Sequence, residues 1–157
     1  MPIADEIAGV LGENWIPTIY SEKIRPLRTR SYEFDVPPKE NRASIQHTLL
    51  GIELKVGRTR MACPDLSTAR YLRVFARIGC GEIAIPYDIS LIPGLADELE
   101  SSWQRTRLVI AERTKGRSQA SAARTRSLVI SSMREEIRKI GAGEKMPLFN
   151  TKTRQRE

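Results

Sequence analysis

The chain has 157 residues, of which 40% are hydrophobic and 29% charged, and its formal net charge is +7. This length suits one compact domain, and the apolar share excludes a disordered chain. No apolar run approaches the roughly 20 residues that span a bilayer, and the first residues lack the basic and apolar regions of a signal peptide, so we expect a cytoplasmic protein.

The positive charge is unevenly distributed. Residues 1–95 hold 12 basic and 11 acidic residues, whereas residues 96–157 hold 14 basic and 8 acidic residues. Arginine outnumbers lysine by 19 to 7, and its planar guanidinium suits phosphate oxygens. This balance is typical of nucleic-acid-binding proteins, although a merely basic, solvated surface has the same composition.

The first elements follow from periodicity. Apolar residues at helical spacing predict a short amphipathic helix over residues 3–11 that ends near Gly12. Residues 13–26 contain two prolines, which predicts a loop with at most a short extended piece over residues 16–20.

A β-hairpin is predicted next. Residues 32–36 alternate between polar and apolar, and Pro37-Pro38 ends that strand. Residues 45–56 form the predicted second strand, antiparallel to the first. Its even-numbered positions 50–56 are apolar and face a core, which places Glu53 and Lys55 together on the opposite face.

The remaining elements follow in order. A basic loop over residues 58–64 leads to a helix over residues 67–79, with Asp65 or Ser67 as its N-cap, and then to a strand over residues 82–89. Residues 95–141 predict a helical hairpin broken at Lys115-Gly116. We therefore divide the chain into an α/β core (1–94), a basic helical hairpin (95–143) and a tail (144–157).

The predicted β-hairpin brings acidic residues together. If its strands pair as expected, Asp35 approaches Glu53 and Lys55. Two carboxylates provide the hard oxygen ligands that Mg²⁺ prefers, and a lysine beside them orients or helps to deprotonate an attacking water. The alternative is an exposed Glu53–Lys55 pair on the wet face of an antiparallel sheet.

An aspartate followed within about thirty residues by Glu-x-Lys on an apolar strand resembles the PD-(D/E)xK nuclease superfamily, which includes restriction endonucleases and Holliday-junction resolvases. The resemblance covers roughly residues 3–90, because a helix and a buried strand follow the Glu-x-Lys strand in the expected order. It implies a restriction-endonuclease-like α/β fold with a central mixed sheet flanked by helices.

The resemblance also implies a site. Asp35 and Glu53 would hold Mg²⁺ or Mn²⁺, and Lys55 would be the catalytic lysine. The aspartate lacks the usual preceding proline, so the choice between Glu33 and Asp35 stays open, and Glu6 on the first helix is a possible additional acid. The implied activity is metal-dependent hydrolysis of DNA phosphodiester bonds by an endonuclease or exonuclease, and a homodimer is an assembly compatible with the resemblance.

Two groups of arginines are candidates for nucleic-acid contact. The first lies near the Glu-x-Lys strand and includes Arg58, Arg60 and Arg70, of which Arg70 is the preferred phosphate ligand. The second surrounds the turn of the helical hairpin and forms a possible phosphate-backbone clamp. Its members are Arg105, Arg107, Arg113, Lys115, Arg117, Arg124 and Arg126.

Two other functions remain open from the sequence. One is a non-catalytic nucleic-acid-binding protein that uses the basic helical hairpin. The other is an interaction protein on a degenerate nuclease scaffold. The two cysteines, Cys63 and Cys80, are too few for a zinc cluster and are expected to be free thiols.

Overall fold

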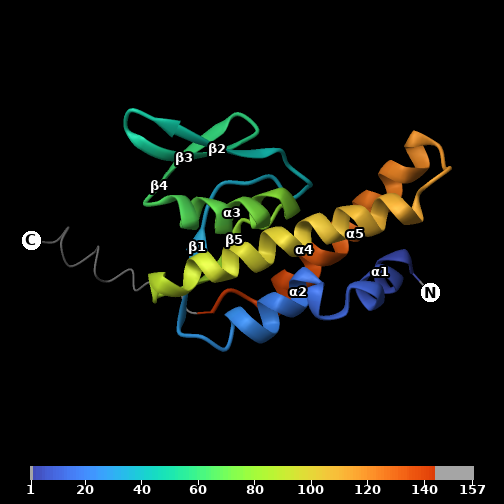
Figure 1. Cartoon of the computed structure of the whole chain (residues 1–157), viewed down its shortest axis with the longest axis horizontal. Helices are drawn as coiled ribbons and strands as arrows, with labels where there is room; N and C mark the ends of the chain where they lie inside the picture. The colour runs from blue at the N-terminus through green and yellow to red at the C-terminus, as the bar shows by residue number, and fades with distance from the viewer. Residues whose placement is uncertain (1, 144–157) are drawn as a thin grey trace, which may run out of the picture.

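The computed structural model describes residues 2–143, which form a mixed α/β arrangement (Figure 1). The α-helices are α1 (Ile3–Leu11), α2 (Ile16–Ile19), α3 (Leu66–Ile78), α4 (Ile92–Arg113) and α5 (Gln119–Ile140). The strands are β1 (Thr29–Glu33), β2 (Ala43–Thr48), β3 (Gly51–Val56), β4 (Thr59–Cys63) and β5 (Glu82–Pro86). Three short helical turns are η1 (Gly12–Asn14), η2 (Tyr20–Ile24) and η3 (Ile89–Leu91).

The strands form two separate antiparallel sheets instead of the expected central mixed sheet. β1 pairs with β5, and β2, β3 and β4 form a three-stranded meander. The predicted pairing of residues 32–36 with residues 45–56 is therefore wrong. The predicted long strand contains a turn at Leu49-Leu50, and both edges of β3 are occupied by β2 and β4. The predicted basic loop over residues 58–64 is largely the strand β4.

Helix α3 is the centre of the core. It packs against the meander on one side and against α4 on another, as Figure 1 shows. Tyr71, Leu72 and Phe75 are completely buried. The helix begins at its predicted N-cap, where the Asp65 carboxylate accepts a hydrogen bond of 2.7 Å from the Thr68 N–H.

Glycine is required where α3 ends. Gly79 has a φ of 93°, and a Cβ added there would lie 2.4 Å from the Lys39 carbonyl oxygen. The loop over residues 37–41 thus passes directly over the end of the helix. The Asn41 side chain fixes this loop by donating to the carbonyls of Pro37, Lys39 and Ala76.

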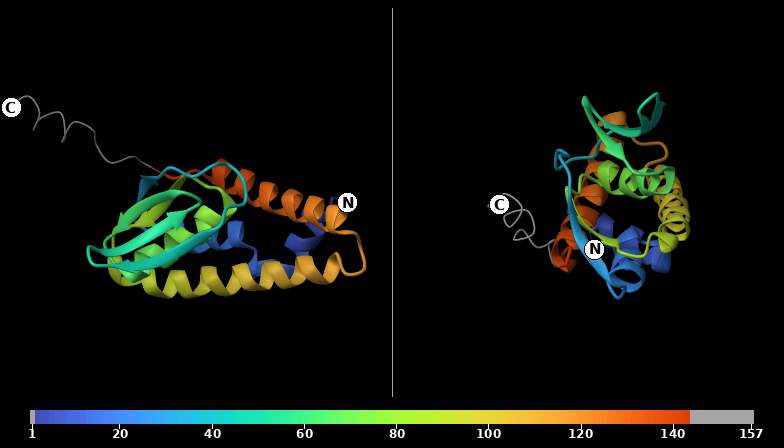
Figure 2. Two further views of the ribbon diagram at one scale, coloured as in Figure 1. Left: turned by 90° about the horizontal axis from the view of Figure 1, so that it is seen from above. Right: turned by 90° about the vertical axis from the view of Figure 1, so that its left-hand side faces the viewer.

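The predicted helical hairpin is confirmed by α4 and α5, which are joined by a turn around Gly116. Both helices contact α1, and their apolar side chains belong to the same core as α1 and α3. In the two views of Figure 2, α4 and α5 run along the molecule on either side of α1 and α2. Neither of them, nor any other helix within residues 2–143, is both long and apolar enough to cross a membrane.

The N-terminal region is more helical than expected. The predicted helix over residues 3–11 is confirmed, but residues 13–24, expected as a loop, form η1, α2 and the π-helical turn η2. Pro17 stands in the first turn of α2, where a missing N–H leaves no hydrogen bond unmade.

Two tyrosines close the free edge of β5. Ser31 of β1 lies opposite Ala84, yet the Ala84 N–H donates to the Tyr20 hydroxyl at 2.8 Å and the Ala84 carbonyl accepts from the Tyr71 hydroxyl at 2.7 Å. Tyr20 in turn donates to the Gly141 carbonyl at 2.8 Å. The backbone N–H and C=O of one buried residue, Ala84, thereby connect η2, α3, β5 and the end of α5.

Replacing Tyr20 with phenylalanine should destabilise the protein. The substitution leaves the buried Ala84 N–H without its acceptor, which costs about 1–3 kcal/mol in the free energy of unfolding. Chemical denaturation monitored by circular dichroism measures this. The matched control is Tyr32→Phe, because Tyr32 is half-buried and its hydroxyl has no hydrogen-bond partner within residues 2–143. Equal losses in the two variants would contradict the bridging role.

The same tyrosine predicts a pH dependence. Burial raises the pKa of Tyr20 to about 12, whereas in the unfolded chain the phenol pKa is about 10. The neutral hydroxyl therefore stabilises the fold fully below pH 10, and this contribution is lost as the pH rises towards 12. The stability difference between wild type and Tyr20→Phe should narrow over that range, and parallel pH profiles would contradict the assignment.

Candidate nucleic-acid interface

Glu53 and Lys55 lie on the exposed face of the meander. In β3 they alternate with Leu54 and Val56, which are buried on the α3 side, as the sequence predicts. Leu50, also expected in the core, is instead fully exposed at the β2–β3 turn. The turn forms there because the Thr48 hydroxyl accepts from the Leu50 N–H and donates to the Gly51 carbonyl.

The predicted delivery of Asp35 to Glu53 does not occur through strand pairing. Asp35 lies just beyond β1, where Phe34 continues the ladder by donating to the Gly81 carbonyl at 2.9 Å. Glu33 lies opposite Glu82 in the same small sheet. The neighbours of Glu53 across the meander are Gln46 and Ala62, so pairing places no second carboxylate beside it.

The residues around Glu53 do not fit a divalent metal ion. Lys55 lies two residues away on the same face, with Ser44 and Arg60 opposite it, so strand register brings cations but no second carboxylate to this face within residues 2–143. Within residues 2–143, no group of three or more His, Cys, Asp or Glu side chains is placed to hold a metal. Oxygen Oε1 of Glu53 is buried and has no hydrogen-bond partner among these residues.

The remaining predicted acid, Glu6, has a structural partner. It joins α1 to α4 through an ion pair of 3.0 Å with Arg113. Arg113 belongs to the predicted clamp, so this ion pair joins a predicted metal-site acid to a predicted phosphate-binding cation.

Arg70 is likewise engaged within the protein. It binds Glu100 at 2.6 Å and Asp97 at 2.5 Å, and Arg73 binds the other oxygen of Glu100 at 2.7 Å. Hydrogen bonding to Glu100 and then to Asp97 raises the pKa of Arg70. These contacts hold α3 against α4, and the predicted phosphate ligand is therefore part of a structural ion-pair network.

The cations of the predicted clamp lie on different faces. Arg126 is held by a bidentate contact with Glu40, in which its Nε lies 2.7 Å from Oε1. Arg105 lies beside Val10 on the α1 side, whereas Arg107 is on the α3 side, close enough to affect Arg77. The other members of the clamp are exposed and have no ion-pair partner among residues 2–143, apart from Arg113. They are Arg105, Arg107, Lys115, Arg117 and Arg124.

A second group of cations, which we call the basic end of the meander, surrounds the β3–β4 turn. Its members are Arg42, Lys55, Arg58 and Arg60. The Gly57 N–H donates to the Arg42 carbonyl, which brings Arg42 to the same end as Arg58. Lys55 and Arg60 lie opposite each other in the β3–β4 pair. Arg42 was not singled out in the sequence because it precedes the predicted strand.

Arg77 lies between Arg107 of the predicted clamp and the start of β2 beside Arg42. Its Nη2 lies 3.4 Å from the Ala43 carbonyl at the start of β2. Burial lowers the pKa of Arg77, and the charges of Arg73 and Arg107 lower it further. In Figures 1 and 2 the meander and the α4–α5 turn rise on the same side of the molecule. We call the meander and the α4–α5 turn the two arms; Arg73, Arg77 and Arg107, from α3 and α4, lie close enough for their charges to repel.

Comparisons with protein-family models, with characterised proteins and with solved structures find no match to this chain. The similarity to PD-(D/E)xK nucleases thus stays a prediction from the residues that carry it.

A substitution at Glu53 separates a metal ligand from an isolated carboxylate. Glu53→Gln should raise the free energy of unfolding by about 0.5–1 kcal/mol, because the amide NH2 can take the place of the orphaned oxygen and donate to the neighbouring Gln46. The matched control is Asp35→Asn at an exposed position, which should change stability by less than about 0.5 kcal/mol. Thermal unfolding is measured with and without millimolar Mg²⁺. Stabilisation by Mg²⁺ that is lost in both variants would contradict this view and support a shared metal site.

Proposed function

We propose that the protein binds the phosphate backbone of nucleic acid, DNA in the first instance, through the basic end of the meander and the nearby Arg107. The observation that carries this proposal is the distribution of ion pairs. Several cations elsewhere are neutralised by carboxylates, as in Lys23–Glu98, Arg70–Glu100 and Arg138–Glu135. On the side between the two arms, Arg42, Arg58, Arg60 and Arg107 have no acidic partner among residues 2–143.

An uncompensated basic surface attracts a polyanion over long range. Each phosphate neutralised by a cation releases counterions, so affinity arises without any base-specific contact. Arginine forks also suit bidentate contact with phosphate oxygens. On the face of the meander away from α3, Glu53 is the acidic side chain. Lys55 and Arg60 lie on the same face, so the two cations outweigh the one carboxylate.

We propose binding without hydrolysis because, within residues 2–143, strand pairing brings no second carboxylate beside Glu53. A nuclease centre of the predicted kind needs at least two acidic ligands, and β1 pairs with β5 instead of delivering Asp35. The reaction chemistry that the resemblance implies therefore receives no support from the arrangement of β3. Labelled DNA incubated with Mg²⁺ or Mn²⁺ should be recovered intact, and cleavage that disappears in Glu53→Gln would overturn this part of the proposal.

Removing two cations from this surface should weaken DNA binding in a salt-dependent manner. For the double variant Arg58→Ala, Arg107→Ala, the slope of log Kobs against log salt concentration should fall in magnitude by about 2, because each phosphate contact contributes about 0.9. Fluorescence anisotropy with a labelled duplex measures the slope.

The matched control removes the same charge elsewhere. Lys23 and Arg138 are exposed cations in ion pairs with Glu98 and Glu135, and the double variant Lys23→Ala, Arg138→Ala should keep the wild-type slope. Equal changes in the two double variants would mean that net charge alone drives binding, and the proposed interface would be wrong.

A further inference from the structure

We propose that the pocket between residues 38–40 and α5 binds a single nucleotide unit, with its phosphate at Arg134 and its sugar or base against Ile130 and Leu128. The inference rests on the proposed function in one respect, namely that an unpaired nucleotide of a bound strand would supply this ligand. The pocket and the basic end of the meander share no residue, so they are tested separately.

The pocket has a size and a frame suited to a ligand. Its volume is about 640 Å³, within the range of small-molecule sites. One wall is the loop that Asn41 fixes to the end of α3, and the other is a face of α5. Because the loop also lies directly over Gly79, its position is set by packing before any ligand arrives.

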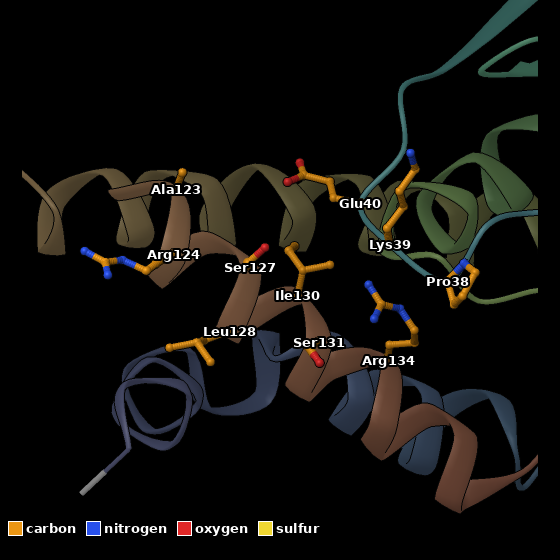
Figure 3. A pocket seen from close by; sticks show the side chains of 10 residues that line it. All are labelled: Pro38, Lys39, Glu40, Ala123, Arg124, Ser127, Leu128, Ile130, Ser131 and Arg134. Atoms are coloured by element: carbon orange, nitrogen blue, oxygen red, sulfur yellow. The ribbon is translucent and has the colours of Figure 1, made fainter. Parts of the chain in front are cut away.

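Arg134 is held in place by the protein. Its Nε donates to the Ile78 carbonyl at 3.0 Å, and the same atom lies over Gly79, where a Cβ would approach it to 2.9 Å. The terminal nitrogens have no hydrogen-bond partner among residues 2–143. Figure 3 shows this end of the side chain in the space between Ile130 and the loop. A guanidinium fixed through Nε leaves its two terminal groups ready for a phosphate.

The remaining charges of the pocket favour an anion. Glu40 lines it, but both carboxylate oxygens of Glu40 are taken by Arg126. Lys39 and Arg124 flank the space on opposite sides in Figure 3, and neither has an ion-pair partner within residues 2–143. The charged ends of Lys39 and Arg124 point away from Ile130 in Figure 3, so Arg134 is the labelled cation directed into the space, and the carboxylate that lines the pocket is already neutralised.

The rest of the lining suits an organic group attached to the anion. Ile130 forms a buried apolar floor, and Leu128 is 59% exposed beside it. Ser127 and Ser131 stand one helical turn apart and offer hydroxyls to a sugar. An inorganic phosphate would use Arg134 alone, whereas a nucleoside monophosphate fills both the basic and the apolar parts.

Titration of the full chain with small ligands tests the pocket without a nucleic-acid strand. Adenosine 5′-monophosphate is added during ¹H–¹⁵N correlation spectroscopy, in parallel with adenosine and with inorganic phosphate. We expect the amides of residues 38–40 and 123–134 to shift with the monophosphate, and its affinity to exceed that of either fragment by about tenfold or more, because binding requires both parts of the pocket.

Two variants and one control assign the site. Ser131→Trp fills the pocket and should weaken monophosphate binding by about tenfold or more. Lys39→Ala, Arg124→Ala removes two exposed cations at the rim and should also weaken it, because the positive potential at the pocket falls, while the fold is kept since neither side chain has a hydrogen bond or ion pair within residues 2–143. The control is Ser21→Trp at an exposed serine of η2 outside the pocket, which should bind as the wild type does.

The outcomes distinguish this inference from the proposed function. Binding of inorganic phosphate as strongly as the monophosphate, or unchanged affinity in Ser131→Trp, would overturn the nucleotide pocket. Duplex binding in Ser131→Trp should equal that of the wild type, because that contact uses the meander. Loss of duplex binding with retained monophosphate binding, as in Arg58→Ala, Arg107→Ala, would support the independence of the two sites.

Discussion

The arrangement of the molecule depends on the backbone N–H and C=O groups of Ala84. A buried strand needs partners for the N–H and C=O groups on both of its edges, because an unpaired buried group is costly. β1 serves one edge of β5, and two tyrosine hydroxyls serve the other at Ala84. Tyr20 also binds the carbonyl of Gly141, so the same interaction fixes where α5 ends. A strand is thus replaced by side chains, and the sheet ends at two strands.

The closed edge of β5 explains why the meander is a second sheet, separate from β1 and β5. With the edge of β5 closed at Ala84, the meander packs through Leu54 and Val56 on α3. The opposite face of β3, with Glu53 and Lys55, is left without a covering element among residues 2–143. A Glu-x-Lys strand in a single mixed sheet would lie near the ends of other strands and their acidic residues. Here it lies among its own hairpin partners, which supply Gln46, Ser44 and Arg60.

Local patterns in the sequence predicted local structure, but they did not predict which strands pair with each other. The helix at residues 3–11, the Asp65 cap and the α4–α5 hairpin follow from periodicity and capping, which neighbouring residues determine. The pairing of β3 does not follow, because Leu49 and Leu50 continue an apolar run although they form a turn. Pro17 suggested a loop and instead begins a helix. Among candidate site residues, the alternation of Glu53 and Lys55 was correctly predicted, whereas the partners of Arg70 and Arg126 lie 30 and 86 residues away in the chain.

The arginines of this protein divide into two groups according to whether a carboxylate reaches them. Glu6, Glu40 and Glu100 each neutralise an arginine and connect α1 to α4, a loop to α5, and α3 to α4. These pairs occupy three carboxylates, which therefore do not oppose the other arginines. Within residues 2–143, no carboxylate pairs with Arg42, Arg58 or Arg107, even though residues 1–95 are nearly neutral in composition. The ion pairs that hold the helices together thus also decide which arginines are left without an acidic partner among residues 2–143.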